Sequence, residues 1–169
     1  MRLQPSALGA IVGAAAETQA LYSSRQTKGS MHFTDVLVAG VVAGLVGVMT
    51  SWLVTGVMFH PYQRLTPGTW RHKEGPREYA LASGATVLAA LIVAAFFAVT
   101  GGVPTLAGSG WVANGALFGF LCWAALGAPA LLSIGLFVNV HAGVVIGLLL
   151  DWLLVSVLAG LATAWAVSR

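Results

Sequence analysis

Four long apolar segments occupy most of the chain between residues 36 and 167. They cover residues 36–59, 81–100, 111–127 and 144–167, and the third can continue to residue 137. A helix needs about 20 apolar residues to cross a bilayer. The strands of a membrane barrel would instead alternate apolar and polar residues. The pattern therefore predicts an all-α, polytopic membrane protein with four transmembrane helices in a bundle.

Residues at the ends of these segments help to define the helices. Thr34 and Asp35 are suitable N-caps for the first segment, and Gly101 and Gly102 end the second. Pro129 lies within the extended third segment and removes one backbone donor. We therefore expect a kink or a break over residues 127–129.

The first 30 residues differ from the rest of the chain. A weak apolar stretch rich in Ala and Gly, residues 7–16, precedes the polar residues 23–28. Such a segment is typical of an interfacial helix, a short signal peptide, or translation upstream of the native start, for which Met31 is an alternative. We divide the chain into an N-terminal extension, residues 1–30, and a four-helix transmembrane domain, residues 31–169.

Composition supports the membrane class. Charged residues make up 8% of the 169 residues and hydrophobic residues 58%, whereas a soluble domain carries about 25% charged residues. The net charge of +3 rests on too few charges to form a nucleic-acid patch. The lipid bilayer is therefore the expected partner, and nucleic acid is not. A single cysteine, Cys122, excludes an intramolecular disulfide.

The distribution of Lys and Arg predicts an orientation. Four of them, Arg64, Arg71, Lys73 and Arg77, follow the first segment, and the loop between the third and fourth segments has none. Loops rich in Lys and Arg stay on the cytoplasmic side. We therefore expect the loop of residues 60–80 in the cytoplasm and both termini outside.

Small residues recur four apart in the predicted helices, which is the spacing of close helix packing in membranes. They pack either within the bundle or against a neighbouring subunit. The clearest pairs lie in the first, third and fourth segments: Gly40 and Gly44, Gly115 and Gly119, and Gly143 and Gly147.

Asp151 is the one formal charge between Tyr79 and Ser168. It lies about 11 Å inside the fourth segment at the α-helical rise, where a charge costs on the order of 3 kcal/mol. One hypothesis is a proton relay or a cation site. The other is a structural hydrogen bond, with Thr50, Ser51, Thr55 or a Trp indole as the partner.

Two histidines near segment ends, His60 and His141, are candidate ligands for a metal, a haem or a chlorophyll-type pigment. Their spacing predicts no defined metal site, and interfacial or capping roles are the more common explanation for such histidines; the cofactor stays unknown. In the loop after the first segment, Trp70, Arg71 and Lys73 suit contact with lipid headgroups or docking of a partner. Glu74 and Glu78 lie beside basic residues and suggest exposed ion pairs.

Motifs of the common enzyme classes are missing. The sequence contains no G-x-S-x-G, P-loop, strand-linked G-x-G-x-x-G or H-E-x-x-H pattern. We therefore expect a protein that is not an enzyme.

From Met31 onward the chain resembles the bacterial domain of unknown function 1761 family of small four-helix membrane proteins. The resemblance rests on the length, on a Gly-rich first helix that leads through residues 56–59 into a loop with Pro and Trp, and on Asn139-x-His141 before the last helix. The Trp-Tyr pair expected near the end of the first helix is absent; Trp52 lies upstream and Tyr62 follows Pro61. The resemblance implies the architecture and a bacterial inner membrane, with no catalytic residues.

Three functional hypotheses follow. The first is a structural or accessory subunit that packs into a larger membrane complex, or into a homo-oligomer, through Gly- and Ala-rich faces. The second is a small transporter or channel-like protein that uses Asp151 and the interrupted third helix. The third is a subunit that holds a cofactor or pigment at His141 or His60.

Overall fold

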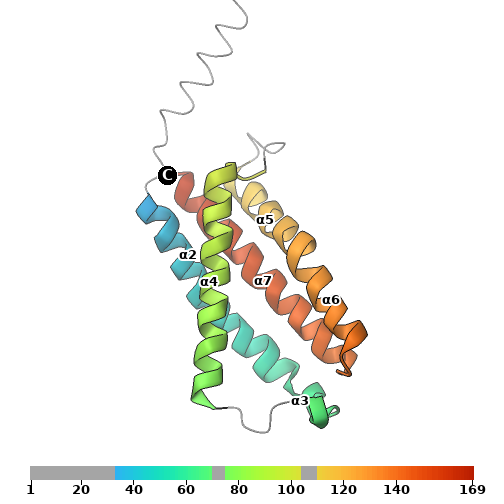
Figure 1. Ribbon diagram of the computed structural model, residues 1–169. Coiled ribbons are helices and arrows are strands. Elements are labelled where there is room, and N and C mark those ends of the chain that lie inside the picture. Colours follow the sequence, from blue (N-terminus) through green and yellow to red (C-terminus); the bar gives the residue numbers. More distant parts are fainter. Residues whose placement is uncertain (1–32, 70–74, 104–109) are drawn as a thin grey trace, which may run out of the picture. The chain divides into compact units, whose positions relative to one another are not determined.

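The computed structural model describes residues 33–69, 75–103 and 110–169 (Figure 1). The predicted N-terminal extension lies outside these residues. The described part contains helices and no strand. Four helical spans are long and apolar enough to cross a membrane: Phe33–Met58, Pro76–Thr100, Trp111–Phe137 and Ala142–Val167. The prediction of an all-α bundle with four membrane helices is confirmed.

Two of the four spans contain a stretch of π-helix, in which the backbone bonds run from residue i to i+5. The elements are α2 (Phe33–Ser51), the π-helix η1 (Trp52–Met58), α3 (His60–Gln63), the 3₁₀ turn η2 (Pro67–Thr69), α4 (Pro76–Thr100), α5 (Trp111–Cys122), the π-helix η4 (Trp123–Gly127), α6 (Ala128–Phe137) and α7 (Ala142–Val167).

Helix α7 is the centre of the bundle. It packs against α2 and α4 on one side and against α5 and α6 on the other (Figure 1). Small side chains allow this: Ala43, Ala90 and Ala159, from α2, α4 and α7, form one buried cluster. Lipid tails are as apolar as the side chains, so helices associate through such close contacts and not through a hydrophobic force.

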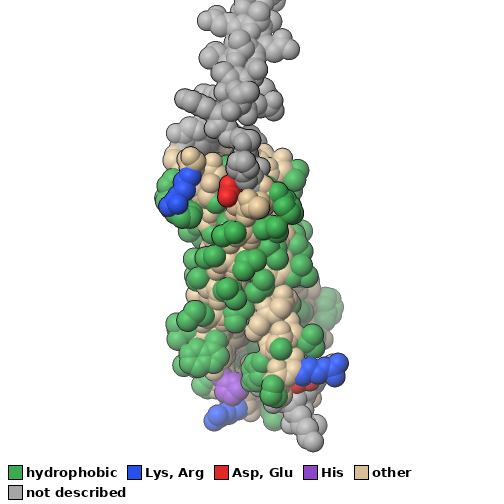
Figure 2. Space-filling view, turned by 90° about the vertical axis from the view of Figure 1, so that its left-hand side faces the viewer, with side chains coloured by type: hydrophobic (Ala, Val, Ile, Leu, Met, Phe, Trp, Pro, Cys, Tyr) green, Lys and Arg blue, Asp and Glu red, His purple; other side chains and the backbone are tan. Residues whose placement is uncertain are grey.

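The outer surface is that of a membrane protein. Large apolar side chains face outward along the spans; Ile92 is 60% exposed and Val99 is 86% exposed. In Figure 2 the charged side chains of the described residues gather near the two ends, and the length between them is covered by apolar side chains. The chain is therefore a multi-pass membrane protein in contact with lipid.

The third span shows how the chain accommodates a proline. Instead of breaking over residues 127–129, the helix widens to η4 and continues as α6. A proline has no N–H to donate, and its ring clashes with the carbonyl four residues earlier. That carbonyl belongs to Ala125, which lies inside η4, where the wider turn can relieve the clash. The expected interruption is therefore a local widening.

The first span repeats this arrangement, which the sequence analysis missed. Pro61 follows η1, and the residue four positions before it, Val57, lies within η1. Both π-helices begin with a Trp and have a Gly four residues later, at Gly56 and Gly127. In each case the glycine lies against the indole of its own Trp. The pattern Trp-x-x-x-Gly followed by Pro is a signal that could have indicated both.

The second span begins five residues earlier than the apolar pattern predicts. Helix α4 starts at Pro76, and the Gly75 N–H donates to Glu78 Oε2 at 3.1 Å. The first turn of α4 is polar, so the hydropathy pattern assigned its residues to the preceding loop. The helix ends at Thr100, followed by Gly101 with φ +71°, as the two glycines predict.

The orientation of the bundle can be tested directly. The start of α2 and the end of α7 lie at one end, opposite α3 (Figure 1). If the Lys and Arg residues after the first span hold that loop in the cytoplasm, a reporter that is active only in the cytoplasm stays inactive when fused after Arg169. The same reporter inserted after Leu65 becomes active. The reverse pair of results would invert the predicted topology.

Candidate functional site

Asp151 lies deep in the span formed by α7. It is about 14 Å along the axis from Ala142, at 1.5 Å per residue, in a helix about 39 Å long. Its side chain is 6% exposed and points into the bundle. An ionisable group at this depth needs partners inside the bundle.

Two hydroxyl groups from the first span approach the carboxyl group. Ser51 Oγ donates to Asp151 Oδ1 at 2.7 Å. Thr55 Oγ1 lies 3.5 Å from Asp151 Oδ2 and donates to the Ser51 carbonyl at 2.7 Å. The third candidate hydroxyl, Thr50 Oγ1, instead donates to the Gly47 carbonyl. The carboxyl group therefore joins α7 to the junction between α2 and η1.

A tryptophan from the third span binds α7 at almost the same level. Trp123 Nε1 donates to the Leu149 carbonyl at 3.0 Å. Trp123 begins η4, just as the residue after Ser51 begins η1. We refer to Ser51, Thr55, Trp123 and Asp151 as the polar centre. It connects α7 to both π-helical segments.

The chemistry available at the polar centre is that of a carboxyl group held by hydroxyls. Such a group can bind a proton or accept hydrogen bonds. Among the described residues, no group of three or more His, Cys, Asp and Glu side chains is arranged to hold a metal ion. The arrangement therefore suits either proton binding or the joining of helices.

His141 has a specific local role at the start of α7. Its Nδ1 accepts a hydrogen bond from the Gly143 N–H at 3.0 Å, which caps the helix. Its ring stacks on Tyr62, with centroids 5.0 Å apart. A neutral imidazole has one nitrogen with a free lone pair, and here that nitrogen is used by the cap. A metal or haem bond through Nε2 would therefore require loss of the cap.

The other histidine of the pair, His60, is half-buried at the first residue of α3. Thr69 Oγ1 donates to the Asn139 carbonyl at 2.6 Å and so joins the loop after the first span to the loop before the fourth. Tyr62, which the sequence analysis did not select, contacts both His141 and the Gly143 position. The stacking partner of His141 is thus an aromatic ring and not a second ligand.

Replacing His141 by alanine removes the cap of α7. We expect the free energy of unfolding to fall by about 1 kcal/mol, which is typical of a lost N-cap. His141→Asn provides an acceptor at a similar position and should retain most of that stability. The measurement is thermal unfolding in detergent. Equal losses in both variants would contradict the capping role.

All six glycines that the sequence analysis selected for helix packing lie against a neighbouring element of this chain. A Cβ on Gly40 would lie 2.8 Å from Leu91 Cδ2, and one on Gly44 would lie 2.8 Å from Val87 Cα, both in α4. Gly115 and Gly119 lie against the α7 backbone; Gly143 and Gly147 lie against Tyr62 and Phe59. The space beside each of these glycines is occupied by atoms of this chain. A neighbouring subunit would therefore contact helix faces other than those that carry them.

The candidate lipid- or partner-binding residues Trp70, Arg71 and Lys73 lie outside the described residues, as does Glu74. Glu78, assigned to exposed ion pairs, accepts the bond from Gly75 that caps α4.

Comparison with known proteins adds no family to this description. The chain matches no family model, no curated protein and no solved structure. The resemblance to the domain of unknown function 1761 family stays a prediction.

Proposed function

We propose that the protein is a non-enzymatic, multi-pass subunit with a structural or accessory role in a larger complex of a bacterial inner membrane. The polar centre supports this proposal because its groups bind helices of the chain to one another. The packing glycines likewise hold elements of this chain together, so another subunit would bind elsewhere on the bundle. These groups serve to build a rigid bundle.

The observation that carries the proposal is the one-sided attachment of the third span. Helices α5 and α6 pack chiefly against α7. The exposed face of this span carries large apolar side chains; Leu126 of η4 and Leu136 and Phe137 of α6 are 73%, 80% and 88% exposed. We assign this face to contact with a transmembrane helix of another subunit.

Photo-crosslinking in the native membrane tests this assignment. A photoreactive residue at Leu126 or Leu136 should give adducts of higher mass, and one at Val99, on α4 and 86% exposed, should not. Native mass spectrometry after extraction in mild detergent should show the same partner. A monomer without adducts from any of these positions would overturn the proposal.

A second candidate function, proton- or cation-coupled transport, is favoured by the position of Asp151 beside η1. π-Helical turns occur often at functional sites, and intramembrane carboxyl groups commonly serve as proton relays. Flux through liposomes that contain the protein, lost in Asp151→Asn while the fold is kept, would support this function. Absence of flux for the native chain, assayed as the purified oligomer, would exclude it.

A further inference from the structure

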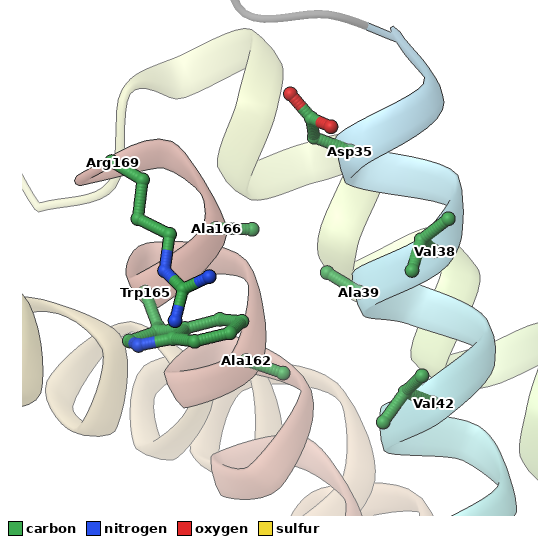
Figure 3. A pocket seen from close by; sticks show the side chains of 8 residues that line it. All are labelled: Asp35, Val38, Ala39, Val42, Ala162, Trp165, Ala166 and Arg169. Carbon is green, nitrogen blue, oxygen red and sulfur yellow. The ribbon is translucent and has the colours of Figure 1, made fainter.

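A cavity of about 300 Å³ opens between the first half of α2 and the end of α7 (Figure 3). Its wall is largely apolar, and one charged residue of α2 and one that follows α7 complete it. The lining residues are Asp35, Val38, Ala39 and Val42 from α2, and Ala162, Trp165, Ala166 and Arg169 from α7 and the residues after it. The volume is at the lower end of the range for ligand pockets.

The two charged side chains of this cavity are held differently. The Arg169 guanidinium lies over the Trp165 ring, 3.4 Å from the ring centroid. This cation–π contact orients the guanidinium and leaves its N–H edge free to donate. Asp35 lies across the cavity on α2, and Figure 3 shows its carboxylate directed away from the guanidinium. The cavity thus presents one positive and one negative group on opposite sides.

The position of the cavity in the bundle matches the headgroup level of a bilayer. Asp35 is in the first turn of α2, and Arg169 follows the last turn of α7. Trp165 is 42% exposed, as is typical of the aromatic residues that lie at membrane interfaces. From this level, the apolar part of the cavity extends inward along Val38 and Val42.

We propose that this cavity binds one phospholipid with a zwitterionic headgroup. The lipid phosphate accepts hydrogen bonds from Arg169, which suits a guanidinium fork. The ammonium group of the headgroup pairs with Asp35. The part of one acyl chain nearest the headgroup lies against Val38, Val42 and the small side chains Ala162 and Ala166. An anionic lipid without an amine carries the same phosphate but leaves Asp35 without a cationic partner, so the zwitterionic lipid is preferred.

Native mass spectrometry of the full chain in detergent tests the site. The probes are phosphatidylethanolamine and phosphatidylglycerol with identical acyl chains. We expect about fivefold greater retention of phosphatidylethanolamine, which corresponds to one charge at headgroup level. Asp35→Asn should abolish this preference, and Arg169→Gln should weaken the retention of both lipids.

Two further variants control the experiment. Arg64→Gln removes an exposed charge at the other end of the bundle and should leave both lipids unchanged. Val42→Phe narrows the apolar part and should reduce the retention of both lipids while their ratio is kept. Equal retention of the two lipids by the native chain, or an unchanged preference in Asp35→Asn, would overturn the proposal. So would the absence of any retained lipid, which is the expected result if a second copy fills the cavity.

Discussion

Replacing Gly119 by alanine is expected to lower the free energy of unfolding by about 2 kcal/mol, within the usual cost of overpacking a close contact. Gly119 of α5 lies directly against the Ser156 carbonyl and against Val157 Cα of α7, and an added Cβ would overlap both. These are backbone atoms and cannot rotate away. The two helices must therefore separate, and α5 has α7 as its main neighbour.

Gly84→Ala provides the matched control for this variant. Gly84 lies in α4 and faces outward, with no atom within 4 Å of an added Cβ. Alanine stabilises a helix interior by roughly 0.5–1 kcal/mol relative to glycine, so this variant should be neutral or slightly more stable. Unfolding of both variants by titration with a denaturing detergent gives the comparison. Similar stability of Gly119→Ala and the native chain would show that α5 and α7 are not so closely packed.

Replacing Asp151 by alanine is expected to weaken the association of α7 with the first span by about 1–2 kcal/mol. When the helices are separated in the bilayer, the carboxyl group faces lipid, which is costly. In the bundle it accepts the Ser51 hydroxyl at 2.7 Å. Asp151 therefore stabilises the assembled bundle relative to separated helices, even though placing its carboxyl group in the bilayer is itself unfavourable.

A double-mutant cycle isolates the Ser51–Asp151 bond. Asp151→Ala, Ser51→Ala and the double variant should give a coupling energy between about 0.6 and 1.7 kcal/mol, which are the average and the maximum measured for hydrogen bonds between membrane helices. Asp151→Asn retains an acceptor oxygen and should lose less than half as much stability as Asp151→Ala. A coupling energy near zero would show that the bond does not hold the two spans together.

The four spans could be predicted from the sequence because one physical constraint dominates. Every backbone polar group in a bilayer must be bonded within the chain, and a long apolar run can do this as a helix. The start of α4 was harder to place, because the side chains of Arg77 and Glu78 can lie in water while their backbone is already helical. Its cap depends on the Glu78 side chain, which a hydropathy pattern does not consider.

The sequence reduces the possible hydrogen-bond partners of Asp151 to a few hydroxyl and indole groups. It does not show which of them bind the carboxyl group. Ser51 and Thr55 are four residues apart and share a helix face, whereas Thr50 is turned away and bonds to Gly47. Which face meets α7 depends on the rotation of one helix against another. That rotation is set by contacts distant in sequence, such as that between Gly47 and Val155. The π-helices were missed for a different reason: their local pattern, Trp-x-x-x-Gly followed by Pro, was not considered.

The central place of α7 also sets an order of assembly. The first two spans contact each other directly and can pair as soon as both are in the membrane. The third span must wait, because its main neighbour is the last of the four to be synthesised. Until α7 inserts, α5 and α6 lack the helix that they mainly pack against.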